Sequence, residues 1–176
     1  QYGYLTGLSA VVVRNINESE RGAFAHITLT RKSMSYFLET VDWLLRDVKK
    51  LRGIMVSGAA TKNTLDLNTL SPSDRQSIKE MINLAADKYG WDLFPFNQPK
   101  VNSFLFDEEN IIYRSSQCSI SNRVDSIGFD GKSVGKCVLR DDTECQTCVC
   151  NLTGLMRGVK SLDKPTLGGL YRSCFG

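Results

Sequence analysis

The 176-residue chain contains a single histidine, His26, and this scarcity restricts the catalytic chemistry open to it. Ribonuclease chemistry based on two histidines is excluded, as is the zinc-protease pattern with two histidines one helical turn apart. A serine–histidine–carboxylate triad would have to use His26, and no Gly-x-Ser-x-Gly turn is present to hold the serine. Because His26 and Phe24 share one side of a predicted strand, we expect the imidazole to be partly buried and hydrogen-bonded.

Long apolar runs and an excess of one charge are also missing. No stretch of 18 apolar residues occurs, so we expect no membrane span within this chain. The 22 basic and 19 acidic residues give a net charge of only +3. Residues 1–100 carry 13 basic and 10 acidic residues, and residues 101–176 carry 9 of each. Neither part has the dense positive field that a phosphate backbone requires, which argues against a nucleic-acid partner.

Cysteine is absent from residues 1–117, and all six cysteines follow: Cys118, Cys137, Cys145, Cys148, Cys150 and Cys174. An even number in an exported protein favours structural disulfides, which is our prediction. Neighbours one residue apart, such as Cys148 and Cys150, would close a strained ring, so the clustered thiols are expected to pair with distant ones. A zinc site and a redox Cys-x-x-Cys pair are the alternatives, although acidic residues 141, 142 and 144 would oppose thiolate formation. We expect neither a cofactor nor a bound metal.

Three features favour a secreted, extracellular protein. The sequons Asn17-Glu18-Ser19 and Asn151-Leu152-Thr153 are acceptor patterns for N-glycosylation, so Asn17 and Asn151 are predicted to be glycosylated. The chain begins at Gln1, which is consistent with removal of a signal peptide. The clustered cysteines add to this prediction.

In residues 1–100 the sequence predicts two strands and two helices. The β-branched segment 4–13 and the alternating segment 24–30 are expected to be strands that form a hairpin. An apolar stripe at helical spacing predicts a helix over 34–52, followed by a short strand at 54–56. Ser71-Pro72-Ser73-Asp74 is typical of a helix start, and Gly90 of its end.

Residues 101–176 are expected to be a cysteine-rich β half. Hairpins are predicted at 103–113 and around Asp130-Gly131, and a last strand at 170–172, whereas 141–169 is expected to be irregular. The two prolines in 91–101 argue against a helix there. Residues 1–176 are therefore predicted to form one α+β domain, in which two main helices pack on one face of a mixed or antiparallel sheet and the C-terminal β region is disulfide-rich.

Aromatic residues give the candidate binding surfaces. Tyr36 and Trp43 lie seven residues apart on the predicted helix, away from its apolar stripe, and Lys50 continues their line. Such a face can anchor a partner, or it can be covered by another part of the chain. A second candidate is the proline-stiffened segment with Trp91, Phe94 and Phe96, which can line a pocket or plug the edge of the sheet.

The sequence therefore favours a non-enzymatic role: a secreted, disulfide-stabilised interaction protein, effector- or toxin-like, that binds a protein or a cell-surface ligand. A second hypothesis is a secreted hydrolase that uses paired carboxylates, for which the acidic clusters at 107–109 and 141–144 are the candidates. The third is the ectodomain of a receptor or viral envelope protein.

Overall fold

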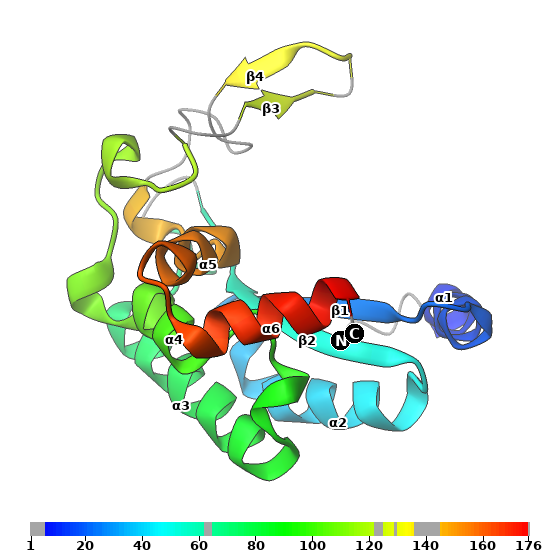
Figure 1. The fold of residues 1–176 in the computed structure, drawn as a ribbon. Coiled ribbons are helices and arrows are strands. Elements are labelled where there is room, and N and C mark those ends of the chain that lie inside the picture. Colours follow the sequence, from blue (N-terminus) through cyan, green and yellow to red (C-terminus); the bar gives the residue numbers. More distant parts are fainter. Residues whose placement is uncertain (1–5, 62–64, 122–124, 129, 136–144, 176) are drawn as a thin grey trace.

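The computed structural model describes residues 6–61, 65–121, 125–128, 130–135 and 145–175 as a single mixed α/β unit. These residues contain six α-helices and a two-stranded parallel sheet, and the first helix lies apart, beyond one end of the sheet (Figure 1). The elements are α1 (Thr6–Glu18), β1 (Ala23–Leu29), α2 (Phe37–Asp47), β2 (Leu51–Gly58), α3 (Pro72–Tyr89), α4 (Pro99–Phe106), β3 (Ser126–Ile127), β4 (Ser133–Gly135), α5 (Asn151–Lys160) and α6 (Lys164–Phe175). Short 3₁₀ turns join several of them, among them η2 (Met34–Tyr36), η3 (Trp91–Leu93), η4 (Glu108–Asn110), η5 (Ser115–Gln117) and η7 (Cys145–Thr147).

The main sheet is parallel, which corrects the prediction of an antiparallel or mixed sheet. β1 and β2 pair in register from Phe24 with Gly53 to Leu29 with Gly58, and α2 crosses between them. A parallel pair needs such a crossover, because the chain must return to the end at which the first strand began. Figure 1 shows α2 and α3 on one side of this sheet and α5 and α6 on the other.

The core forms where the sheet meets the helices. Its most deeply buried side chains come mainly from α2, β2, α3, α4 and the loop before α4, and include Phe37, Val41, Ile54, Val56, Ile78, Ile82, Phe94, Val101 and Phe106. Burying a side chain of this kind stabilises the folded state by about 1.5–3 kcal/mol. The stripe predicted for residues 34–52 is thus a real core face, but its helix ends at Asp47 and β2 begins at Leu51.

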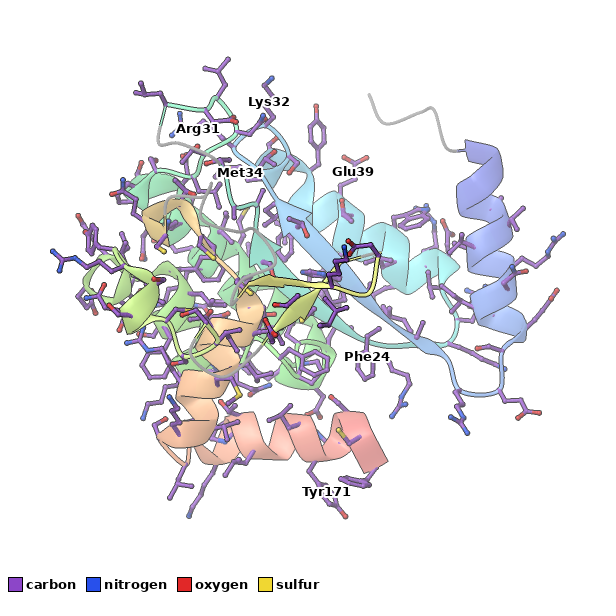
Figure 2. The ribbon with its side chains drawn as sticks, turned by 90° about the horizontal axis from the view of Figure 1, so that it is seen from above. Phe24, Arg31, Lys32, Met34, Glu39 and Tyr171 are labelled. Carbon is purple, nitrogen blue, oxygen red and sulfur yellow. The ribbon has the colours of Figure 1, made fainter. Side chains whose placement is uncertain are left out.

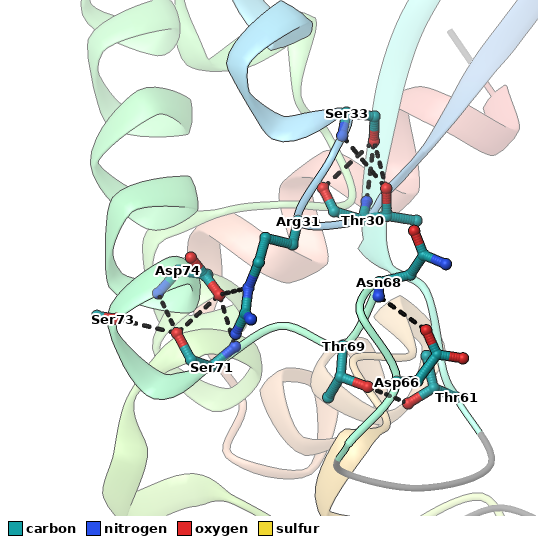
Figure 3. Close-up of polar contacts among 10 residues, drawn as sticks. All are labelled: Thr30, Arg31, Ser33, Thr61, Asp66, Asn68, Thr69, Ser71, Ser73 and Asp74. Atoms are coloured by element: carbon teal, nitrogen blue, oxygen red, sulfur yellow. Dashed lines mark hydrogen bonds and ion pairs between the residues drawn. The ribbon is translucent and has the colours of Figure 1, made fainter.

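The start of α3 confirms the predicted capping sequence. Ser71 Oγ accepts the Asp74 N–H at 3.1 Å, and the Asp74 carboxylate accepts the Ser71 N–H at 2.8 Å. Arg31, just beyond β1, pairs with the same carboxylate at 2.8 Å and ties the strand to the helix (Figure 3). Burial alone would raise the pKa of Asp74, but the bonds from Ser71 and Arg31 hold that pKa below its usual value.

Other predicted strands are helices. Segment 4–13 falls largely within α1, so the hairpin predicted with residues 24–30 is wrong. Residues 99–106 form α4, with Pro99 at its first turn, in place of one arm of the predicted 103–113 hairpin. The expected irregular stretch 141–169 contains α5, and the predicted last strand 170–172 lies inside α6. The described C-terminal residues are therefore mainly helical, and the antiparallel strands β3 and β4 occupy the hairpin predicted around Asp130-Gly131.

Candidate functional site

The predicted face of Tyr36, Trp43 and Lys50 is not continuous. Tyr36 is 59% exposed in the 3₁₀ turn η2, which precedes α2. Trp43 is half-buried and packs against the core. Lys50 lies beyond the end of α2, and its Nζ donates to the Ser19 carbonyl. Of these three, Tyr36 alone presents an open aromatic ring.

The second predicted group, Trp91, Phe94 and Phe96, is mostly internal. Phe94 is completely buried and belongs to the core, and Trp91 is partly buried against it. Phe96 stacks edge-to-face on Phe24 of β1, with ring centroids 5.2 Å apart. The segment therefore packs on the sheet, as in the alternative in which its aromatic residues plug the edge of the sheet.

The most exposed aromatic surface lies on α6, where the sequence had indicated a strand. Leu167, Tyr171 and Phe175 follow each other at four-residue spacing and are 38%, 67% and 77% exposed. The rings of Tyr171 and Phe175 lie 5.3 Å apart. Figure 2 shows Tyr171 projecting from the outer side of the helix. We call these three residues the α6 stripe. Their spacing was the available sequence signal, but Gly168 and Gly169 obscured a helix there.

The opposite side of α6 is fixed to the rest of the fold. A Cβ added at Gly169 would meet the Pro95 carbonyl oxygen at 2.3 Å, so the helix backbone approaches that loop closely. Near the end of α6, Arg52 donates to the Ser173 carbonyl at 3.2 Å. The same guanidinium lies over the Phe24 ring, 5.2 Å from its centroid. Figure 2 shows Phe24 on the side of β1 that faces α6. These contacts hold the helix, and with it the α6 stripe, in one position.

A polar pair occupies the surface of the sheet. His26 on β1 is exposed, and its Nε2 lies 2.9 Å from Ser57 Oγ on β2. The Asn151 N–H, at the start of α5, donates to the same hydroxyl at 3.3 Å. No hydrogen bond or ion pair from a carboxylate to the His26 ring occurs among the described residues. The pair therefore lacks the group that orients histidine in a hydrolytic triad.

Both predicted glycosylation sites are engaged inside the fold. Asn17 Nδ2 donates to the Asp47 carbonyl at 2.9 Å, and its Oδ1 accepts the Lys49 N–H at 2.7 Å. Asn151 is 2% exposed, and its Nδ2 donates to the Phe96 carbonyl at 3.0 Å. A glycan replaces a hydrogen on that nitrogen, so glycosylation of either residue stays a prediction that the folded structure does not favour.

Of the carboxylate cluster 107–109, Asp107 has a structural role. Its side chain pairs with Lys79 of α3 at 2.5 Å and accepts the Ser103 hydroxyl at 2.5 Å. Burial would raise its pKa, but these two partners hold the pKa below the usual value. Glu108 and Glu109 are exposed in the turn η4. The second predicted acidic cluster, 141–144, lies outside the described residues.

The cysteine pattern does not support a disulfide-rich region. Cys118, Cys150 and Cys174 form no disulfide, and no disulfide joins any two described cysteines, whereas Cys137 lies outside the described ranges. Burial would raise the pKa of Cys118, but backbone hydrogen bonds from Ser121 and Ile120 outweigh it and lower that pKa. The predicted disulfides thus gain no support. In the part of the chain that the structure describes, no three His, Cys, Asp or Glu side chains are placed to hold a metal ion.

Within the described ranges, no helix combines the length and apolar character needed to cross a membrane. No family model, curated protein or solved structure gives a significant match to this chain. Functional inference therefore depends on the geometry of the chain itself, and the α6 stripe is its clearest candidate surface.

Proposed function

We propose that this protein acts by binding another protein, with the α6 stripe as the anchoring surface. The observation that supports this most is the exposure of Leu167, Tyr171 and Phe175 along one face of a helix. Side chains at such spacing are the usual contacts when a helix lies in an apolar groove of a partner. Aromatic anchors of this type dominate the binding energy of many protein interfaces.

The surroundings of the stripe also suit a binding surface. Because α6 is held on its inner side at Gly169, little backbone order has to be gained on binding. The contact between Tyr171 and Phe175 restricts both rings before a partner arrives. At the rim, Arg172, next to Tyr171 in the sequence, pairs with the exposed Asp92 at 2.8 Å, so a charged pair borders the apolar residues. This combination of apolar centre and polar rim is common to protein interfaces.

The effector- or toxin-like role and the extracellular location stay predictions from the sequence. Neither the sequon asparagines nor the described cysteines add support to secretion, for the reasons given above. The binding role itself requires no particular compartment, since it depends on the exposed α6 stripe. Of the two carboxylate clusters considered for a hydrolase, only 107–109 lies within the described residues, and there Asp107 is occupied by Lys79 and Ser103.

The proposal can be tested by placing a photoactivatable amino acid at Tyr171 and, as a matched control, at Leu84. Leu84 is 58% exposed on α3 and lies outside the α6 stripe. We expect a discrete cross-linked partner from position 171 but not from 84. Unlabelled wild-type protein should compete for it, whereas the Tyr171→Ala/Phe175→Ala protein should compete at least about 30-fold less well, as expected for the loss of about 2 kcal/mol.

Two results would refute this function. One is the same set of adducts from positions 171 and 84, which would indicate non-specific contact. The other is equal competition by the wild-type and double-alanine proteins. Circular dichroism of the double variant should be unchanged, because both side chains are exposed.

A further inference from the structure

The side of β1 that faces away from β2 has no neighbouring strand. In the part of the chain that the structure describes, this sheet contains only β1 and β2. In a parallel pair, each strand bonds to its neighbour through alternate residues. The Leu29 carbonyl accepts the Ala59 N–H, just beyond β2, at 2.7 Å, so Leu29 and the alternate residues Ala25 and Ile27 face β2. The other alternate residues point their backbone N–H and C=O groups away from β2: Phe24, His26 and Thr28.

The outer edge of β2, in contrast, is closed by other parts of the fold. The Asn97 side chain accepts the Val56 N–H at 2.7 Å and donates to the Val56 carbonyl at 3.1 Å. The Gly58 N–H donates to the Val149 carbonyl at 3.0 Å. Because these contacts occupy the edge of β2, β1 is the strand beside which a further strand can be added.

Serine side chains close both ends of the β1 edge and leave its middle open. Before the strand, Ser19 Oγ accepts the Gly22 N–H at 3.0 Å, and after it Ser33 Oγ accepts the Thr30 N–H at 2.9 Å. No hydrogen bond to the outward backbone groups of residues 24, 26 and 28 occurs among the described residues. Among the described helices and strands, β1 makes extensive contacts with β2 alone. We call Phe24–Thr28 the open edge.

The open edge lacks the usual protection against pairing with another chain. Natural edge strands are often very short, or they carry a lysine, a proline or an inward-pointing charge. β1 has seven residues and contains no Lys, Arg, Asp, Glu or Pro. Its irregularity in pairing, between Ala23 and Phe24, lies at the start of the open edge and leaves the rest of it regular. An unprotected edge of this kind is a template for an added strand.

The two faces of the open edge determine which side chains an added strand would need. On one face, Ala25 and Ile27 are half-buried and pack against the core. On the other face, His26 and Thr28 are exposed. Side chains alternate between the two faces of a strand. A segment with apolar residues at every second position would therefore extend the core on the first face and keep polar residues on the second.

A second copy of the chain fits the open edge less well. When two β1 strands pair antiparallel with their longest overlap, His26 lies opposite His26 of the other copy. The same pairing brings Arg21 of one copy beside Arg31 of the other. Like charges placed opposite each other oppose the pairing of strands. The occupant that the edge favours is therefore a different chain.

We infer that the open edge binds an extended segment of another protein, which adds to β1 as an antiparallel third strand. The backbone of this segment would exchange hydrogen bonds with Phe24, His26 and Thr28, and the main chain would supply the affinity. The antiparallel direction is favoured because its pairing is slightly more stable per residue than parallel pairing. This site is separate from the α6 stripe and does not depend on it.

The test measures the binding of fluorescein-labelled peptides to the full chain by fluorescence anisotropy. The probe is the alternating peptide Thr-Val-Thr-Val-Thr-Val-Thr, with an aspartate at each end for solubility. One variant is N-methylated at every threonine and the other at every valine. In the antiparallel pair, residues that bond to His26 have side chains on its exposed face, so the threonine amides face β1. We expect methylation at threonine to weaken binding at least about tenfold, and methylation at valine to leave it within about twofold.

A backbone change in the protein tests the same contact. Thr28→Pro removes an outward N–H without removing a bond to β2, and proline is tolerated at such edge positions. It should weaken binding of the probe at least about tenfold, whereas Thr28→Val keeps the N–H and should bind as the wild type does. The Tyr171→Ala/Phe175→Ala protein should also bind normally, which separates this site from the α6 stripe. If Thr28→Pro loses its far-ultraviolet circular dichroism, the two methylated peptides decide by themselves.

Three results would overturn the proposal. One is equal binding of the two methylated peptides, and another is the absence of binding by the unmodified probe at about 1 mM protein. The third is a wild-type dimer in sedimentation velocity that Thr28→Pro abolishes, because it would assign the open edge to a second copy of the chain.

Discussion

Replacing Asn97 tests how the free side of β2 is stabilised. Asn97 is completely buried, and its side chain pairs with the backbone of Val56 in the middle of the strand. Its Oδ1 accepts the Val56 N–H at 2.7 Å, and its Nδ2 donates to the Val56 carbonyl at 3.1 Å. Nδ2 also lies 3.0 Å from Asn102 Oδ1. One amide thus takes the place that the backbone of a further strand would occupy.

Asn97→Ala should lower the free energy of unfolding by about 3 kcal/mol. The Val56 N–H loses its side-chain acceptor, and Asn102 Oδ1 loses its donor. A buried polar group left without a partner costs about 1–3 kcal/mol, so two such groups together cost about 2–6 kcal/mol, and about 3 kcal/mol lies in the lower part of this range. The Val56 carbonyl is affected less, because Asn151 Nδ2 also donates to it at 3.3 Å.

Urea denaturation followed by circular dichroism measures this loss. Asn15→Ala is the matched control, because Asn15 is exposed on α1, and we expect it to stay within about 0.5 kcal/mol of the wild type. Asn97→Asp adds a second check: its carboxylate would face the Val56 carbonyl, so its deficit should shrink as the pH falls and the buried acid is protonated. A loss below about 1 kcal/mol for Asn97→Ala would refute the role assigned to this side chain.

Three further changes test other contacts. Ser71→Ala should cost about 1 kcal/mol in urea denaturation, because the α3 cap is lost. Gly169→Ala should be strongly destabilising and Gly168→Ala tolerated, because an added Cβ would meet backbone at 2.3 Å in the first case and a flexible side-chain atom at 3.5 Å in the second. The lowered pKa of Asp107 means that its ion pair contributes stability above the unfolded pKa near 4, which is lost as the pH falls through the folded pKa. The melting temperature of Asp107→Asn should accordingly approach that of the wild type between pH 7 and pH 3.

The sequence predicted the elements whose signals are local. α3 begins and ends where capping chemistry places it, at Ser71 and Gly90, because a cap depends on residues within one turn. β1 was recognisable from its alternation, and in the structure Leu29 is buried while His26 and Thr28 are exposed. Neither the alternation nor the cap contains information about pairing, so the parallel partnership with β2 could not be predicted from them.

Elements that depend on packing were mispredicted. Val11, Val12 and Val13 favour a strand by intrinsic preference, yet they lie within α1. α5 contains Gly154 and Gly158, which weaken a helix when judged by propensity. A Cβ at Gly154 would lie 2.7 Å from a side-chain atom of Leu105 in α4, so the close contact of these two helices requires glycine there. The same residue that obscures the helix in the sequence is the one that allows it to pack.

The candidate sites also depend on contacts between residues that lie far apart in the sequence. Arg75 donates to the Gln146 carbonyl, 71 residues further along the chain, and the neighbouring Thr147 and Val149 bond to Thr61 and to Gly58 at the end of β2. Such contacts join residues that no helical or strand periodicity relates, so the sequence pattern could not predict them.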